Sequence, residues 1–222
     1  MLMAREIDVF LLAFPALLSI INPVGGAFTF LTVTRRASHA ERETTARVIA
    51  IYGFVLLNAS LYVGAYVLEF FGVSLPVLRV GGGMVVAVTA WKLLQADEPE
   101  ESAEAEARAN CRPGELRKLA FYPLTMPITT GPGTISVAIA LGTARSGGIQ
   151  GFVEFAIGAS LATVANCVLI YVCYRYADSV AARFGVTGTQ IVMRLSAFLL
   201  LCIGLQVLWN GLSELLGMLT RH

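Results

Sequence analysis

Two polar interruptions in otherwise apolar stretches hold the residues best suited to bind a small molecule. The first reads INPVGG over residues 21–26, and the second reads MPITTGPGT over residues 126–134. Proline lacks a backbone N–H, and its ring clashes with the carbonyl four residues earlier, so a helix ends or kinks near it. Asn22 is predicted to cap a half-helix that begins at Pro23, and Pro132 is predicted to begin the corresponding half-helix in the second interruption. Each interruption therefore predicts a helix that stops and restarts.

A half-helix that starts inside an apolar protein presents a polar end. Its first N–H groups carry roughly half a positive charge and suit a carboxylate, whereas the carbonyl groups before the interruption suit an ammonium group or a cation. A zwitterion fits both ends. The residues predicted to form this substrate-binding site are Asn22, Pro23, Gly25, Gly26, Thr129, Thr130, Gly131, Pro132, Gly133 and Thr134. The alternative is that the prolines only kink the helices and that the polar residues cap and pack them.

Two asparagines lie near the middle of other apolar stretches. An unpaired amide in such a place is costly, so Asn58 and Asn166 must find partners. They either line the same site by bonding the interrupted segments or make an ordinary hydrogen bond between helices.

Two arginines, Arg79 and Arg194, each begin an apolar stretch close to a membrane interface. An arginine there either extends its guanidinium to lipid headgroups or, as a more specific hypothesis, forms an ion pair that gates the transport path. As gates, Arg79 is expected to pair with Glu69 or Glu154. Arg194 is expected to pair with Asp178.

Catalysis finds little support among the remaining residues. The two histidines are His39, in a loop, and His222, at the C-terminus, and the carboxylates lie near the ends of the apolar stretches. No metal site or Ser-His pair can be assembled from these residues in the middle of a membrane. We expect neither an enzyme nor a metal or other cofactor.

The composition shows what must position these residues. Hydrophobic residues make up 56% of the 222 residues and charged residues 14%, and the mean hydropathy is +0.72. A helix of about 20 apolar residues crosses the hydrocarbon core of a bilayer. Stretches of at least that length cover residues 9–33, 48–70, 75–94, 119–142, 151–174 and 189–212. The sequence therefore predicts an all-α membrane protein with six transmembrane helices, of which the first and fourth are broken.

The basic residues are distributed unevenly among the loops. Most lie at the ends of the first, third and fifth stretches or in the loops that follow them, at Arg35, Arg36, Arg42, Arg47, Lys92, Arg108, Arg112, Arg117, Lys118, Arg175 and Arg183. Only Arg5, Arg145 and Arg221 lie in the other loops and the termini. Lys and Arg mark the cytoplasmic face, so both termini are predicted to be periplasmic. Because topology explains these charges, no signal for a nucleic-acid partner remains.

The two halves of the chain resemble one another. Pro23, Asn58 and Arg79 recur in the same order as Pro132, Asn166 and Arg194. Residues 1–96 and 118–222 are therefore predicted to be three-helix repeats, joined by a cytoplasmic linker, residues 97–117, that is rich in Ala and Glu. An odd number of helices in each half inverts the second copy relative to the first, which is typical of transporters.

These segments also carry a family resemblance. INPVGGAFTFL and MPITTGPGTIS resemble the two signature segments of the MarC family of bacterial inner-membrane proteins, also called the neutral amino acid transporter family, and the likeness covers nearly the whole chain. The resemblance implies six helices in two inverted halves, a location in the inner membrane, and transport of small neutral amino acids such as alanine, glycine and serine.

We therefore expect a secondary transporter that works by alternating access around a midplane site. The sequence leaves the coupling ion open between sodium and protons, and it leaves open a homo-oligomer. The alternatives are an exporter of another small metabolite or ion, and a membrane scaffold or sensor that transports nothing. A metal exporter is disfavoured because the core is nearly uncharged.

Overall fold

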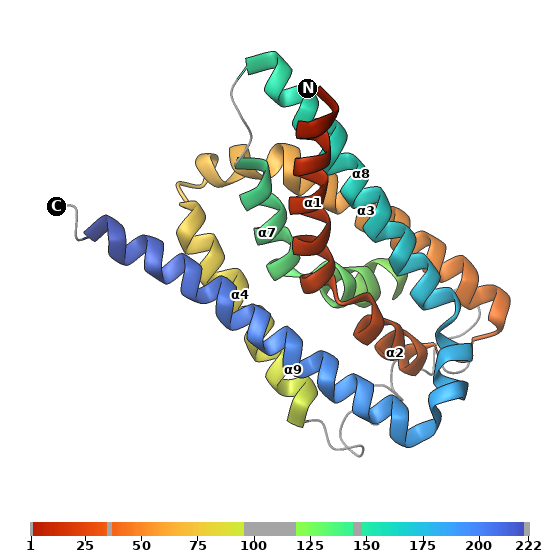
Figure 1. Cartoon of the computed structure of the whole chain (residues 1–222). Coiled ribbons are helices and arrows are strands. Elements are labelled where there is room, and N and C mark those ends of the chain that lie inside the picture. The colour runs from red at the N-terminus through yellow and green to blue at the C-terminus, as the bar shows by residue number, and fades with distance from the viewer. Residues whose placement is uncertain (1, 35–36, 96–118, 144–147, 220–222) are drawn as a thin grey trace.

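The computed structural model describes residues 2–34, 37–95, 119–143 and 148–219, and these residues form helices and connecting turns with no strand among them. Figure 1 shows the helices in chain order, which are α1 (Leu2–Ile21), α2 (Pro23–Val33), α3 (His39–Phe70), α4 (Leu75–Gln95), η1 (Ala120–Thr129), α7 (Pro132–Thr143), α8 (Gly148–Arg175) and α9 (Ala177–Leu219). The linker predicted at residues 97–117 lies outside the described residues. The division of the chain into two repeats stays a prediction.

The described helices are long and apolar enough to cross a membrane. The segments that meet this condition by themselves are Arg5–Val33, which joins α1 and α2, and His39–Phe70, Leu75–Gln95, Gly148–Arg175 and Thr187–Met218. A sixth is obtained if η1 and α7, which are bent by 66° relative to each other, count as one span. The prediction of an all-helical membrane protein is therefore confirmed.

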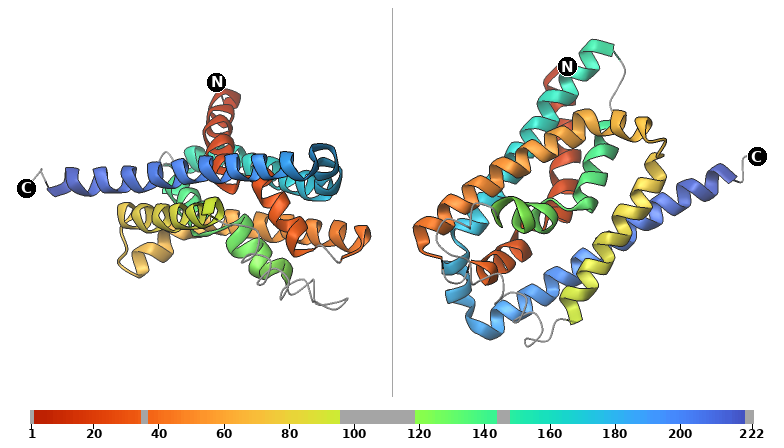
Figure 2. Two further views of the ribbon diagram at one scale, coloured as in Figure 1. Left: turned by 90° about the horizontal axis from the view of Figure 1, so that it is seen from below. Right: turned by 180° about the vertical axis from the view of Figure 1, so that it is seen from behind.

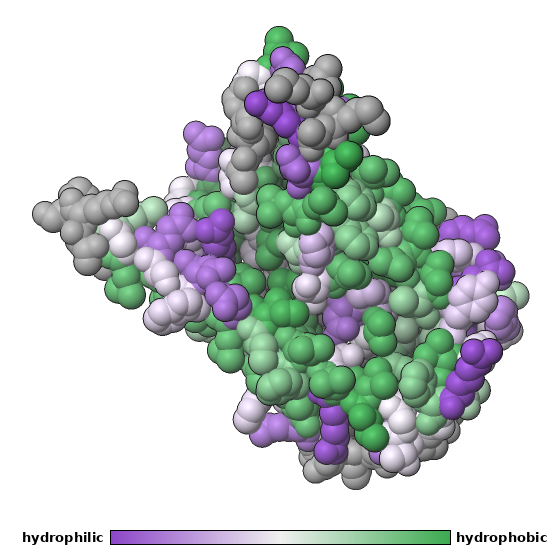
Figure 3. Space-filling model, viewed as in Figure 1, coloured by the Kyte–Doolittle hydropathy of each residue, from purple (hydrophilic) through white to green (hydrophobic). Residues whose placement is uncertain are grey.

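The surface of the molecule is largely apolar. Figure 3 shows mainly hydrophobic residues over the middle of one face and hydrophilic residues near its edges, apart from a small hydrophilic patch near the centre. Many large apolar side chains are exposed, such as Leu161, Phe198 and Trp209. Such a surface suits lipid tails and would be unfavourable in water.

The helices pack in a small number of extensive pairs. α4 lies along α9, α1 lies beside α8, and α3 packs on both α7 and α8 (Figures 1 and 2). Glycines allow α4 and α9 to approach closely: a Cβ added to Gly83 would lie 2.5 Å from the Leu208 nitrogen, and one added to Gly204 would lie 2.7 Å from the Ala87 nitrogen. Small residues at such an interface are typical of membrane helices.

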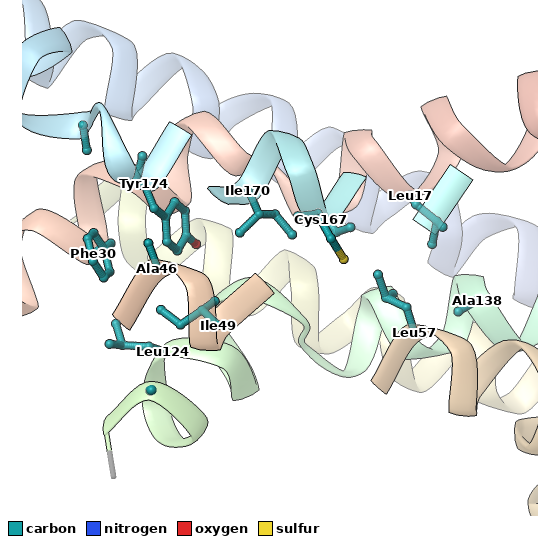
Figure 4. Close-up of a cluster of buried hydrophobic side chains, with 14 of the residues drawn as sticks. Leu17, Phe30, Ala46, Ile49, Leu57, Leu124, Ala138, Cys167, Ile170 and Tyr174 are labelled. Carbon is teal, nitrogen blue, oxygen red and sulfur yellow. The ribbon is translucent and has the colours of Figure 1, made fainter. Parts of the chain in front are cut away.

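A buried apolar cluster joins α1, α2, α3, η1 and α8. Figure 4 shows side chains of this cluster, including Leu17, Phe30, Ile49, Leu124 and Tyr174. The rings of Phe30 and Tyr174 stack with their centroids 4.9 Å apart. This cluster holds α2, which follows the first interruption, and η1, which precedes the second, against α3 and α8.

The ion pairs correct one prediction about the arginines. Arg79 of α4 binds Glu214 of α9 at 2.5 Å, and the predicted partners Glu69 and Glu154 are wrong. The reason is that α4 and α9 run antiparallel: Gly211 lies against Pro76, whereas Gly204 lies against Ala87, so the start of α4 is beside the end of α9.

The other end of α9 is held by a second arginine. Asp178, the predicted partner of Arg194, accepts hydrogen bonds from Arg42 of α3 at 2.5 Å. Arg42 also donates to the Thr34 carbonyl at 2.9 Å, so one guanidinium ties the end of α2 to the starts of α3 and α9.

Candidate ligand-binding site

The first interruption is a single residue between α1 and α2. Asn22 has a left-handed backbone, with φ 46° and ψ 62°, a conformation that Asn tolerates better than most residues with a side chain. Its Oδ1 accepts a hydrogen bond from the Gly25 amide at 3.2 Å and so caps α2, which begins at Pro23. Its Nδ2 donates to the Ser196 carbonyl of α9 at 3.4 Å. Asn22 therefore satisfies the start of α2 and links it to α9.

The second interruption is wider and has no side-chain cap. η1 ends at Thr129 and is not a regular helix, because Tyr122 and Met126 inside it have extended backbone angles. The Thr130 amide closes its last turn on the Thr125 carbonyl at 2.7 Å. The Gly131 carbonyl accepts from the Ile135 amide at 3.0 Å, which makes Gly131 the N-cap residue of α7. A Cβ at Gly131 would lie 2.7 Å from the Pro127 carbonyl, so the turn has no room for a side chain.

A cavity of about 160 Å³ lies between the two interruptions. Its wall is drawn from both interrupted segments and from α4 and α9. The lining residues are Ile20, Ile21, Asn22, Gly25, Gly26, Thr29, Val85, Val86, Thr89, Leu93, Pro127, Ile128, Gly131, Pro132, Gly133, Thr134, Met193, Ser196, Ala197 and Leu200. Segments more than a hundred residues apart in sequence therefore face one space.

The wall of the cavity has one apolar side and no charged side chain among the described residues that line it. α4 and α9 contribute mainly aliphatic side chains, such as Val85, Val86 and Leu200. α2 and α7 contribute the polar groups around the interruptions. The wall therefore suits a small molecule with a polar end and a short apolar body, and it offers no charged side chain to pair with a charged side chain of the ligand.

Most of the residues predicted from the sequence line this cavity. Those in the wall are Asn22, Gly25, Gly26, Gly131, Pro132, Gly133 and Thr134. The others at the interruptions, Pro23, Thr129 and Thr130, are buried and do not line it. Thr130 is fully buried with a hydroxyl that has no hydrogen-bond partner among the described residues.

The two asparagines of the middle helices lie away from the cavity wall. Asn58 donates to the Thr163 hydroxyl at 3.3 Å, which links α3 to α8. Asn166 donates to the Phe14 carbonyl at 3.3 Å, which links α8 to α1. Both form hydrogen bonds between helices, the simpler of the two roles expected for them.

The two arginines proposed as gates also lie outside the cavity wall. Arg79 is held by Glu214, and Arg194 is exposed on α9 one residue after the lining residue Met193. No group of three or more His, Cys, Asp or Glu side chains in the described part of the chain is arranged to hold a metal ion.

Tyr174 of α8 is an important residue that the sequence did not indicate. It is buried, and its hydroxyl lies 2.8 Å from the Thr129 hydroxyl at the end of η1. A Cβ added to Gly26 of α2 would collide with the same hydroxyl. One side chain therefore touches both interrupted segments, and Figure 4 shows it pointing into the space between Phe30 and Ile49. A tyrosine near the end of an apolar stretch looks like an ordinary interface residue, so sequence alone gave no signal.

The α9 residues that line the cavity were only weakly indicated by the sequence. Met193, Ser196 and Ala197 lie in the segment MRLSAFL, which aligns with LRVGGGM in the first half. The repeat therefore pointed to the segment, although not to the side chains that reach the cavity.

The fold and the site define the class: a helical integral membrane protein with a small uncharged cavity between two interrupted spans. The chain belongs to the MarC family, because the model described as MarC family integral membrane protein matches residues 7–216. No solved structure matches the chain.

Several relatives carry the name UPF0056 inner membrane protein MarC. The one from Salmonella typhimurium is 32% identical over 203 residues, which covers 90% of this chain and 92% of the relative. Those from Citrobacter koseri and Escherichia coli O1:K1 are 30% identical over 207 and 206 residues, with the same coverage.

Proposed function

We propose that the chain is a secondary transporter of small neutral amino acids, such as alanine, glycine and serine, across the bacterial inner membrane. The observation that carries this proposal is the cavity shared by the two interruptions. Paired broken segments around one site near the middle of the membrane are a recurring architecture of secondary transporters. A kink without a ligand would not require both interruptions to face the same space.

The pattern of helix contacts supports an inverted repeat. If the spans of the first half (α1 with α2, α3, α4) exchange places with those of the second half (η1 with α7, α8, α9), the contacts map onto one another. The packing of the first span on α8 corresponds to that of η1 and α7 on α3. The packing of the first span on α9 corresponds to that of α7 on α4. The pairs α3 with α8 and α4 with α9 map onto themselves, as a pseudo-twofold axis requires.

The division of the wall supports alternating access. α4 and α9 pack extensively on each other and form one side of the cavity, whereas the broken spans form the other. A rocking of the α4 and α9 pair against the broken spans would change access to the cavity without unfolding any helix. Coupling to sodium ions or protons is part of this proposal and is tested by the experiment below. A homo-oligomeric state is also part of the proposal.

The uncharged wall supports selection against charged amino acids. A charged side chain on the amino acid would meet no charged partner in this wall, and leaving such a charge uncompensated at membrane depth costs at least about 2.5 kcal/mol. We therefore expect serine and glycine to compete with alanine, and lysine and glutamate to fail. Tryptophan is expected to fail because the close approach of the helices at Gly25, Gly26, Gly131 and Gly133 leaves little room for a large side chain.

The test is uptake of radiolabelled alanine by proteoliposomes, with and without sodium and proton gradients. Leu200→Phe fills the cavity from α9, and its matched control Leu199→Phe places the same ring on the neighbouring exposed position. We expect Leu200→Phe to lose most of the uptake and Leu199→Phe to retain it. Absence of uptake under every gradient would favour the scaffold or sensor, and uptake that serine fails to compete would favour an exporter of another metabolite.

The proposed topology places both termini in the periplasm. A cysteine introduced at Ile149, an exposed residue at the start of α8, should then react with an impermeant thiol reagent in intact cells, whereas Cys111 in the proposed cytoplasmic linker should not. Protection of the introduced cysteine together with labelling of Cys111 would reverse the orientation.

A further inference from the structure

The N-termini of α2 and α7 differ in how their first amides are satisfied. At α2, the Asn22 side chain accepts from the Gly25 amide, so the helix is capped from within. At α7, the N-cap residue is Gly131, which has no side chain to offer. No side chain accepts a hydrogen bond from the amides of Gly133 or Thr134 in the described part of the chain. Both residues are buried and line the cavity, so the start of α7 borders the ligand space.

The Thr134 hydroxyl is a second group without a partner at the same place. Thr134 is 3% exposed and lines the cavity, yet its hydroxyl makes no hydrogen bond to any of the described residues. The other threonines of the wall are satisfied within their own helices: Thr29 donates to the Gly25 carbonyl at 3.3 Å, and Thr89 to the Val85 carbonyl at 2.8 Å. A buried hydroxyl left unpaired is unfavourable unless a ligand or water completes it.

The surroundings restrict what can bind there. A helix N-terminus with free amides and a hydroxyl donor suits an anion, and α7, with 12 residues, is long enough to have a dipole. The absence of Lys and Arg from the described wall disfavours a doubly charged phosphate, whose charge would stay uncompensated. A singly charged carboxylate with a short aliphatic body fits both the donors and the apolar side chains Val85, Val86 and Leu200.

We propose that the N-terminus of α7 is a carboxylate site, in which the Gly133 and Thr134 amides and the Thr134 hydroxyl donate to one carboxylate. The capped N-terminus of α2 does not share this role. The inference rests on the proposed function for the identity of the natural ligand, an amino acid whose carboxylate points to α7. The site itself takes any short aliphatic monocarboxylate that fits the cavity.

The test is calorimetric titration of the purified protein with three probes. Alanine has both charged groups, propionate has only the carboxylate, and alaninamide has only the ammonium group. We expect alanine and propionate to bind the wild-type protein and alaninamide not to bind. Thr134→Val is expected to weaken propionate binding about tenfold, because it removes a hydrogen bond to a charged group.

Two variants control for a purely structural effect. Thr134→Ser keeps the hydroxyl and should restore propionate binding to near the wild-type affinity. Thr143→Val removes a hydroxyl from the exposed far end of α7 and should leave binding unchanged. The unfolding midpoint without ligand shows whether each variant is folded.

The outcomes separate this inference from the proposed function. Propionate binding that depends on Thr134 supports the site even if alanine is not transported, and in that case only the proposed function fails. Transport of alanine with an unchanged KM in Thr134→Val overturns the carboxylate site and leaves the function standing. Equal binding of alaninamide and alanine, or no binding of propionate to the wild-type protein, also overturns the site.

Discussion

The two interrupted segments occupy corresponding places in the two halves of the chain, yet they satisfy their polar groups differently. At the first, Asn22 alone separates α1 from α2, and its side-chain oxygen caps α2. α1 and α2 therefore still form one apolar span. At the second, η1 and α7 are bent by 66°, and the glycine at the turn provides no cap. The start of α2 is capped by Asn22, whereas at the start of α7 the Thr134 hydroxyl, in a residue that lines the cavity, has no partner among the described residues. Similar sequence signals thus produce a structural joint in one half and a binding surface in the other.

Substitution of Gly133, at the start of α7, is expected to have the largest effect on alanine uptake, and it tests whether the second interruption binds the ligand. A side chain there would collide with Val86 of α4 and cover the start of α7. Since overpacking costs about 1–3 kcal/mol, we expect Gly133→Leu to reduce alanine uptake by up to about a hundredfold. The matched control is Gly81→Leu, because Gly81 is exposed on α4 with open space around it. Equal uptake by the two variants in proteoliposomes would mean that the start of α7 is not part of the site.

Asn22 gives the next largest effect, and here the readout is stability. Asn22→Ala removes the cap, at about 1 kcal/mol, and puts a residue without a local hydrogen bond into the left-handed conformation, at about another 1 kcal/mol. Asn22→Gly removes the same cap but adopts that conformation freely, so it should cost only about half as much. Denaturant unfolding in detergent measures both. If glycine proved as destabilising as alanine, the strained turn would not be what Asn22 provides.

Tyr174 tests whether the two segments depend on one another. Tyr174→Phe keeps the ring stacked on Phe30 but removes the hydrogen bond with Thr129, which should cost about 1 kcal/mol of stability. Tyr176→Phe removes a hydroxyl from a half-exposed ring two residues further on and should be close to neutral. The measurement is the thermal unfolding midpoint of each variant. A midpoint for Tyr174→Phe equal to that of the control would show that this contact does not hold η1 in place.

The smallest effect is expected at the asparagines of the middle helices. Neither Asn58 nor Asn166 lines the cavity, so Asn58→Leu and Asn166→Leu should leave the KM for alanine unchanged. Each loses one hydrogen bond between helices, worth about 0.6 kcal/mol in membrane proteins. A severalfold rise in KM in either variant would restore the hypothesis that these amides contact the ligand.

Much of the fold was predictable because membrane spans are determined locally. Any helix of about 20 apolar residues is long enough to cross a bilayer, so the six stretches could be identified without knowing their neighbours. The partners of Arg79 could not be identified in this way. Glu69 and Glu154 were sensible choices by predicted side of the membrane, but Glu214 is the partner because α4 and α9 pack along their lengths.

The sequence by itself determined the class of protein and the positions of the two interruptions, because composition, proline chemistry and glycine chemistry act over a few residues. Only the tertiary structure decided that both interruptions face one cavity, that α4 and α9 complete its wall, and that Tyr174 touches both segments. It also decided that Asn22 satisfies its own helix, whereas Thr134 is left without a partner. These outcomes depend on which helices pack together and on how side chains meet across more than a hundred residues of sequence. No local pattern encodes that information.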